Sequence, residues 1–294
     1  MRPIVITFDR AYVRAAAALV RSLARTRQGK PTKVIAIVDD IPGMCRSELC
    51  AVGDKAGLDL QFRDVVDACL GLPVSDHGSP TAYYRLLLGD MLPEFSSVVY
   101  VDCDAIFLRD PAELLVDAYD PYPVAAVQDL CNPTLGSPLG LPGYPVSQGD
   151  RDTPYFNSGL MVIDLDLWRS MGIGHKAIRF AIEYPQCVRF WDQDALNAVL
   201  RGNWHALDRR WNVVPLGELW TVAPFAYHGV RQVPRVQLDQ LCHEAFLLHY
   251  ASRLKPWMDG FPPGPSRDRW LEFDKPSAIR CCSGPGGLRQ AAPL

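Results

Sequence analysis

Two aspartates separated by one residue form the most chemically informative motif in this sequence. Asp102 and Asp104 follow residues 98–101, an apolar and partly β-branched run that predicts a buried strand. Carboxylates two positions apart on an extended chain point the same way, and at the carboxyl end of a strand they face the crevice where α/β proteins bind ligands. Hard oxygen ligands of this kind suit Mg²⁺ or Mn²⁺, which would bridge them to a diphosphate. The alternative is a pair that only caps a turn.

Three further stretches carry side chains suited to ligand binding. Residues 155–159 (YFNSG) place small polar residues and a glycine before an apolar strand, where a ligand can approach the backbone closely. Asp192 and Gln193 begin a predicted helix, so they either bind a ligand or only cap the helix and offset its dipole. His249 and Lys255 lie six residues apart. A neutral histidine can bind a metal and a lysine can bind phosphate, although both can also be purely structural.

Alternating strands and helices must position these residues. Strands are predicted at residues 4–8, 34–38, 60–62, 98–101, 124–127 and 155–165. Helices are predicted at residues 12–25, 47–56, 81–92, 168–184 and 192–200. This order predicts an α/β fold with a mainly parallel sheet flanked by helices. Residues 129–154 hold five prolines and four glycines, which indicates either a functional lid or a floppy insertion.

Composition excludes several classes of protein. The chain has 294 residues, enough for one large domain or two ordinary ones, and a net charge of −3, which supplies no field for gripping nucleic acid. Its nine cysteines form no CxxC pair, which argues against a disulfide scaffold or structural zinc site and for a reducing compartment. No apolar run approaches the roughly 20 residues of a membrane span, and we expect no signal peptide and a cytoplasmic protein.

The last 44 residues differ from the rest in texture. Residues 251–294 hold seven prolines and five glycines, and seven lysines or arginines against four acids. Trp257, Phe261, Trp270 and Phe273 are interleaved with these charges. Such a segment is either a disordered end or a peripheral attachment to an anionic membrane surface, in which aromatic rings enter the headgroup region.

Seven stretches together resemble glycosyltransferase family 8, the retaining enzymes of GT-A fold that include bacterial lipopolysaccharide galactosyl- and glucosyltransferases and the glycogenins. They are residues 4–12, 81–93 (TAYYRLLLGDMLP), 98–110 (VVYVDCDAIFLRD), 155–169 (YFNSGLMVIDLDLWR), 190–197 (FWDQDALN), 207–212 (LDRRWN) and 249–257 (HYASRLKPW). Each motif is only moderately specific, but all seven occur in the family's order. The resemblance implies a GT-A (nucleotide-diphospho-sugar transferase) catalytic domain over residues 1–250, with residues 251–294 completing the donor site.

The resemblance also implies roles for individual residues. It assigns Asp102, Asp104 and His249 as ligands of a Mn²⁺, or of Mg²⁺, that also holds the donor diphosphate. The matching nucleoside positions are Thr7, Asp9 and Tyr12, the phosphate-binding lysine is Lys255, and the arginine that contacts donor sugar and phosphate is Arg85. The positions around the transferred sugar are Asn157, Asp192 and Gln193, and Gln193 lies where a nucleophile would be sought. Ala11 and Ser252 depart from the family pattern, where asparagine and glycine are common.

The activity implied is transfer of galactose or glucose from a UDP-sugar, with retention, to a saccharide acceptor such as a lipopolysaccharide core or another surface glycan. An amide at Gln193 is a poor nucleophile, so we favour a front-face substitution over the double displacement of retaining glycosidases. Two alternatives remain open from sequence. One is a glycogenin-like enzyme that glucosylates itself as a primer, and the other is a nucleotide-sugar binding protein without turnover.

Overall fold

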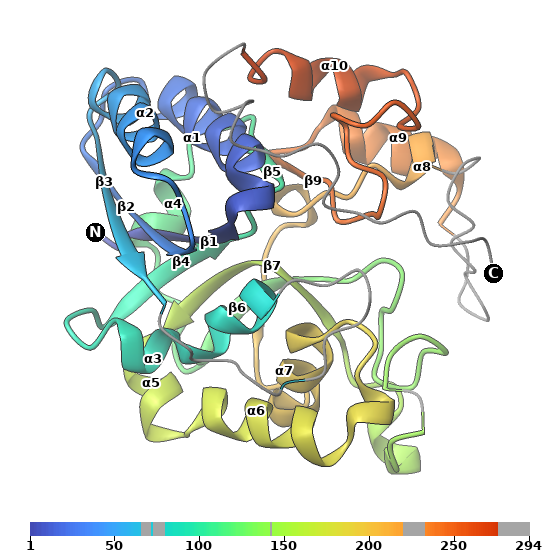
Figure 1. Ribbon diagram of the computed structural model, residues 1–294. Helices are drawn as coiled ribbons and strands as arrows, with labels where there is room; N and C mark the ends of the chain where they lie inside the picture. The colour runs from blue at the N-terminus through green and yellow to red at the C-terminus, as the bar shows by residue number, and fades with distance from the viewer. Residues whose placement is uncertain (66–71, 73–79, 142, 220–232, 276–294) are drawn as a thin grey trace.

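A seven-stranded sheet forms the centre of the molecule. The computed structural model describes residues 1–65, 72, 80–141, 143–219 and 233–275. Within them the strand order is β3-β2-β1-β4-β7-β6-β8 (Figure 1). The strands are β1 (Ile4–Asp9), β2 (Thr32–Asp39), β3 (Leu58–Asp64), β4 (Ser97–Val101), β6 (Val124–Gln128), β7 (Phe156–Asp164) and β8 (His205–Ala206). Neighbouring strands are parallel except that β7 runs antiparallel to β4 and β6. The predicted mainly parallel α/β fold is confirmed, although the reversal of β7 was not predicted.

Helices cover both faces of this sheet. The helices in the described part of the chain are α1 (Val13–Arg27), α2 (Gly43–Asp54), α3 (Leu88–Met91), α4 (Ala112–Val116), α5 (Leu165–Ser170), α6 (Ile173–Glu183), α7 (Asp192–Leu200), α8 (Leu216–Leu219), α9 (Arg235–His243) and α10 (Pro265–Leu271). Figure 1 shows α1 and α2 on one side of the sheet and α5 and α6 on the other. Val34 and Ala36 of β2 join the core under α1, whereas Ile35 and Ile37 join the core under α6. The uninterrupted apolar run therefore reflects a strand buried on both faces.

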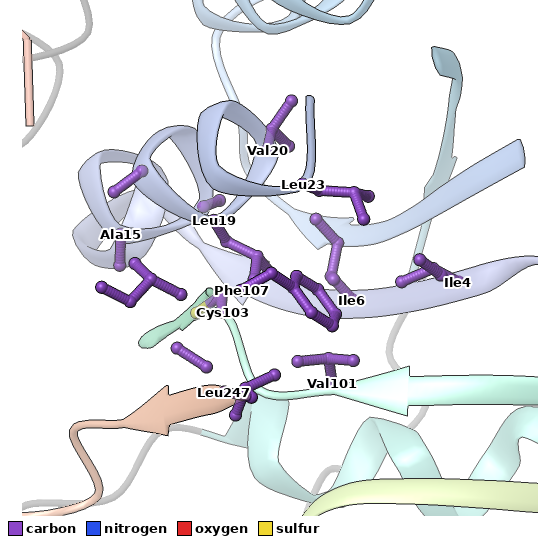
Figure 2. Close-up of a cluster of buried hydrophobic side chains, with 14 of the residues drawn as sticks. Ile4, Ile6, Ala15, Leu19, Val20, Leu23, Val101, Cys103, Phe107 and Leu247 are labelled. Carbon is purple, nitrogen blue, oxygen red and sulfur yellow. The ribbon is translucent and has the colours of Figure 1, made fainter. Parts of the chain in front are cut away.

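A second, two-stranded sheet extends from the chain segment that carries the two aspartates. β5 (Ala105–Phe107) pairs antiparallel with β9 (Leu247–His249), and Ala105 lies opposite His249. Neither short strand was predicted. Figure 2 shows Cys103, Phe107 and Leu247 in the apolar cluster beneath Ala15 and Leu19 of α1. Cys103 lies in the turn between β4 and β5 and is buried in this core, whereas Asp102 and Asp104 on either side of it converge on His249.

The predicted helix over residues 168–184 is two helices. α5 ends before Gly172, whose φ of +64° belongs to the left-handed region, and α6 begins directly after it. Glycine adopts this conformation without steric cost, so one helix can end and the next can begin at this residue. The predicted helix over residues 81–92 likewise divides into a 3₁₀ helix (Pro80–Leu87) followed by α3.

The segment rich in proline and glycine at residues 129–154 is anchored in its described part. Leu135 and Leu141 are buried in the core beneath α6, and Thr134 forms a β-bridge with Pro154. The ring of Tyr144 packs edge-on against Phe180. These contacts tie the segment to the folded body, so it is not a floppy insertion. Residue 142 lies outside the described residues.

Residues 251–275 pack on the amino-terminal helix. Phe261, Trp270 and Phe273 are buried in the core that includes α1, and an ion pair of 2.5 Å joins Arg14 to Asp274. The prediction that aromatic rings of this segment enter a membrane is therefore wrong for these three, because the fold already buries them. The rest of the predicted tail, residues 276–294, lies outside the described residues.

Two further findings bear on the expectations from composition. No disulfide joins any two of the six cysteines within the described residues. In the same part of the chain, no helix is long and apolar enough to cross a membrane.

Candidate active site

Three potential metal ligands converge where β4, β5 and β9 meet. One ligand atom from each of Asp102, Asp104 and His249 lies within 4.8 Å of the other two. The Nε2 atom of His249 is 3.5 Å from Asp102 Oδ2 and 3.4 Å from Asp104 Oδ1. Two carboxylate oxygens and an imidazole nitrogen are a donor set that Mn²⁺ accepts, and their convergence fits a single divalent cation.

Gly159 of β7 makes room for this histidine. A Cβ atom at residue 159 would lie 2.1 Å from Cε1 and 2.5 Å from Nδ1 of His249, which is far inside van der Waals contact. The same residue connects β7 to the first aspartate, because the backbone N–H of Asp102 donates to the carbonyl of Gly159. This glycine lies within β7, and it allows close approach by a side chain of the protein itself.

We expect Gly159→Ala to displace His249, to weaken Mn²⁺ binding at least about tenfold and to lower the free energy of unfolding by about 1–3 kcal/mol, the usual cost of overpacking. Isothermal titration with Mn²⁺ and urea unfolding measure the two effects. Gly43→Ala is the matched control, since a Cβ there meets nothing within 4 Å. Equal Mn²⁺ affinity in both variants would contradict the assignment of His249 as a ligand.

Lys255 lies on one side of the three ligands. Its Nζ donates to Asp104 Oδ2 at 2.6 Å and to the carbonyl of Tyr250 at 2.8 Å. Burial disfavours the charged form of Asp104, but Lys255 and His249 outweigh this effect and hold its pKa below the usual value. Lys255 Nζ also lies 5.8 Å from the ring centre of Tyr12. Burial raises the pKa of Tyr12 to about 12, so its phenol remains a neutral hydrogen-bond donor.

Arg85 links the aspartate pair to the start of α7. Its guanidinium donates to Asp102 Oδ1 at 2.7 Å, lies 3.1 Å from Asp192 Oδ2 and donates to the carbonyl of Ser158 at 2.9 Å. Burial opposes its charge, but Asp102 and Asp192 outweigh burial and raise the pKa of Arg85. Tyr100 donates a second hydrogen bond to Asp102 Oδ1 at 2.8 Å. Asp102 is thus oriented by two partners before any ligand binds.

The predicted nucleoside-binding residues lie at the carboxyl end of β1. The hydroxyl of Thr7 is buried and forms a hydrogen bond of 2.9 Å with Tyr100. Asp9 accepts from the backbone N–H of Ala11 at 2.9 Å and so caps the short 3₁₀ helix that leads to α1. The edge of the Tyr12 ring contacts Trp257. Their roles in holding uracil and ribose stay predictions.

Gln193 and Asp192 are buried and fully engaged with protein partners. The Nε2 of Gln193 donates to Asp129 Oδ2 and to the hydroxyl of Tyr155, both at 3.2 Å, and its Oε1 accepts from the N–H of Ser158. Asp192 accepts from the hydroxyl of Ser158 at 2.8 Å. Burial raises the pKa of Asp192 to about 6, although the positive charge of Arg85 offsets part of this rise.

Asp129 is a site residue that the sequence interpretation missed. It directly follows β6, and its Oδ2 accepts from Nδ2 of Asn157 at 3.1 Å as well as from Gln193. A signal was present, because an acid at the carboxyl end of a predicted parallel strand is the same pattern that singled out Asp102. Asn157 connects Asp129 to the candidate metal ligands. Its Oδ1 accepts from Asn212 at 2.9 Å, and Asn212 in turn is hydrogen-bonded to His249.

Asp194 supports Gln193 indirectly, through the hydroxyl of Tyr155. It is fully buried, accepts from the hydroxyl of Tyr155 at 2.7 Å and accepts from the backbone N–H groups of Arg189 and Phe190. Its side chain therefore fixes the residues that precede α7 and does not cap the helix, whose first residues have no side-chain capping hydrogen bond. Burial raises its pKa to about 7, because the hydrogen bonds offset only part of the cost of a buried charge.

The raised pKa of Asp194 makes stability depend on pH. Between about pH 4 and pH 7 the folded protein keeps a proton that the unfolded chain, with a pKa near 3.8, has lost. Stability from this group is therefore full below pH 4 and falls as pH rises to 7, by up to about 4 kcal/mol. Urea unfolding of the wild type and Asp194→Asn across pH 4.5–7.5 should give a flatter profile for the variant. Parallel profiles would contradict the assignment.

Comparison with solved structures identifies the class of this fold. The galactosyltransferase LgtC, crystallised with donor and acceptor sugar analogues, matches with a TM-score of 0.75 at 22% identity, over 95% of this chain and 99% of that one. GlyE of Streptococcus pneumoniae TIGR4 matches with a TM-score of 0.68 at 23% identity, over 96% of this chain and 63% of that one. The fold is therefore that of a GT-A glycosyltransferase.

The chain belongs to glycosyl transferase family 8, whose family model matches residues 3–260. General stress protein A of Bacillus subtilis is 32% identical over 74% of this chain and 73% of its own length. The lipopolysaccharide 1,2-glucosyltransferase of Escherichia coli is 24% identical over 67% of this chain and 54% of its own length. The resemblance drawn from seven sequence motifs is thus confirmed at the level of the family and of glycosyl transfer.

Proposed function

We propose that this protein transfers a hexose, glucose or galactose, from a UDP-sugar to a saccharide acceptor with retention of configuration. The observation that carries the proposal is the convergence of Asp102, Asp104 and His249 between Lys255 on one side and the buried pair Asp192 and Gln193 on the other. A cation site beside a buried lysine suits a diphosphate, and a buried polar pocket next to it suits the sugar attached to that diphosphate.

Three residues would hold the cation, Mn²⁺ or Mg²⁺, and others would hold the leaving group. A divalent cation, when bound, supplies positive charge to the diphosphate oxygens, where negative charge develops as the bond to the sugar breaks. Lys255 would add a second positive charge at the same place, and its contact with Asp104 would be exchanged in part for the diphosphate. Tyr12 and the packed residues 251–275 would complete the donor site around it.

Gln193 and Asp192 are both held by hydrogen bonds or ion pairs to protein groups, and this supports a front-face substitution. The bond from sugar C1 to the diphosphate oxygen breaks with its electron pair leaving on the diphosphate. The acceptor hydroxyl then attacks C1 on the same face and passes its proton to the departing diphosphate. Gln193 is a neutral amide with its carbonyl bound to the N–H of Ser158, and Asp192 is held by Arg85 and Ser158, so neither is a free nucleophile.

A lipopolysaccharide core or another surface glycan, free or lipid-linked, is the acceptor class we propose. It is supported by the lipopolysaccharide glucosyltransferase of E. coli among the relatives. A cytoplasmic location, with or without peripheral contact at the inner membrane face, stays a prediction. Membrane contact is tested by removing only residues 276–294. The residues before them include core side chains, and removing those would disrupt the fold.

The test is release of UDP from UDP-glucose and UDP-galactose with Mn²⁺, with and without saccharide acceptors, and with EDTA as the control. We expect turnover with one donor, a large increase on adding the acceptor and loss of turnover in EDTA. Sugar on a tyrosine of the purified protein would instead indicate the glycogenin-like alternative. Binding of UDP without release would indicate the non-catalytic one. A covalent glycosyl adduct on Asp192, detected by mass spectrometry, would overturn the front-face mechanism.

A further inference from the structure

A continuous chain of polar side chains connects the metal ligands to the sugar pocket. His249 Nδ1 is 2.9 Å from Asn212 Oδ1, and Asn212 Nδ2 is 2.9 Å from Asn157 Oδ1. Asn157 Nδ2 then donates to Asp129 Oδ2, which also accepts from Gln193. The members come from β9, the turn before residue 213, β7, the end of β6 and α7. Asn212 is the middle link on the metal side, and its motif, LDRRWN, has so far no role in the proposed reaction.

The direction of every hydrogen bond in this chain follows from its two fixed ends. The backbone N–H of Gly159 can only donate, and it bonds Asn157 Oδ1 at 3.0 Å. The carboxylate of Asp129 carries no hydrogen and can only accept, and its other oxygen accepts two backbone N–H groups. Asn157 therefore presents its oxygen to Asn212, and Asn212 must present its amino group to Asn157 and its own oxygen to His249.

An amide oxygen only accepts, so the hydrogen of a neutral His249 ring lies on Nδ1. Its Nε2 then carries the lone pair and faces Asp102 and Asp104. A metal-binding histidine needs this arrangement, and its second nitrogen is commonly fixed by a partner of this kind. The backbone makes the pairing rigid, because Val213 N–H donates to Leu247 O and His249 N–H donates to Val213 O.

We propose that Asn212 is a positioning residue that fixes the Nδ1–H tautomer of His249 and thereby its affinity for a divalent cation, and that it ties this ligand to the sugar pocket through Asn157. The proposal rests on the proposed function for the identity of the site, but the tautomer itself does not depend on turnover. Asn212 and His249 are both buried, which limits access of water to the hydrogen bond between them.

The first experiment reads the tautomer directly. Long-range ¹H–¹⁵N spectra of the chelator-treated protein at about pH 8.5, with His249 assigned by its loss in His249→Gln, should show a protonated Nδ1 and a free Nε2 in the wild type. Asn212→Asp retains an acceptor for Nδ1–H and should keep this tautomer. Asn212→Leu should give a mixture of both forms. A wild type with the hydrogen on Nε2 would overturn the proposal.

The second experiment measures Mn²⁺ affinity by electron paramagnetic resonance. We expect Asn212→Leu to lose about 10–100-fold, the usual effect of removing a partner of a metal-binding histidine, and Asn212→Asp to stay close to the wild type. Asn203→Leu, at an exposed asparagine, is the control for the exchange and should change nothing. Wild-type affinity in Asn212→Leu would overturn the proposal. If the wild type binds no Mn²⁺, the metal site of the proposed function fails, and the tautomer still decides the role of Asn212.

If Asn212→Leu does not fold, as monitored by circular dichroism, the wild type and Asn212→Asp carry the test. Asn212→Asp places a second carboxylate oxygen against Asn157 Oδ1 and so breaks the link to the sugar pocket while keeping the link to His249. We expect a raised KM for the donor sugar with unchanged Mn²⁺ affinity. If Asn212 had only a structural role, Asn212→Asp would change both the KM and the Mn²⁺ affinity, or neither of them. Either result would overturn the proposal.

Discussion

Asp104→Asn is expected to reduce Mn²⁺-dependent release of UDP from the donor by at least about 10³-fold. Asp104 contributes one of the three converging ligand atoms and also accepts from Lys255, so its loss weakens both sources of positive charge at the diphosphate. Charge stabilisation of this kind contributes several kcal/mol to a transition state, and each 1.36 kcal/mol corresponds to a factor of about ten in rate. UDP release at saturating donor measures the change.

This experiment needs two controls. Asp59→Asn removes an exposed carboxylate that lies 3.6 Å from Lys33, and it should leave turnover unchanged. Because Asp104→Asn leaves the buried ammonium of Lys255 without its carboxylate, circular dichroism must establish that the variant is folded at the assay temperature. Turnover within tenfold of the wild type in a folded variant would refute the metal assignment.

Arg85→Leu is expected to lower the free energy of unfolding by about 3–5 kcal/mol. The guanidinium is buried between Asp102 and Asp192 and forms an ion pair with each of them. Removing one member of a buried ion pair leaves an uncompensated charge, which costs more than the pair itself contributes. Part of the loss will be relieved as Asp192 takes up a proton, because its pKa of about 6 rises further without Arg85.

Urea unfolding at pH 5 and pH 8 separates the two contributions. We expect a smaller loss at pH 5, where Asp192 can be neutral, and the full loss at pH 8. Arg235→Leu removes an exposed arginine that lies 3.7 Å from Asp239 and should cost less than about 1 kcal/mol at either pH. An equally small effect for Arg85→Leu would show that the buried charges are solvated in the folded protein.

Much of the metal side of this site was predictable from local sequence. Asp102 and Asp104 end an apolar strand, and that position alone places both carboxylates at the ligand-binding edge of the sheet. The family resemblance then added His249 and Lys255, which the fold brings to the same place. The convergence of these four side chains was predictable because a strand end and an ordered set of motifs are properties of the chain that do not depend on tertiary detail, and their roles toward a cation and a diphosphate stay predictions.

The remaining features depend on contacts between distant segments. β5 and β9 are three residues each, too short for a periodic pattern, and each exists because the other pairs with it. The direction of β7 has no signature in its apolar run, since a strand buried on both faces looks the same in either direction. Asp129 follows a predicted strand and Asn212 ends the LDRRWN motif, but neither position shows what its side chain contacts, and only the hydrogen bonds that each forms with Asn157 reveal its place in the site.

The pairing of β5 with β9 also bears on how the protein folds. Ala105 and His249 are register partners although nearly half the chain separates them, so closing this contact costs more loop entropy than any hairpin. A nascent chain that has emerged only as far as α9 has both aspartates but lacks the histidine. A cation site built from these three residues would therefore be completed late in folding, and a cation that needs all three ligands would stabilise the finished fold without helping earlier intermediates.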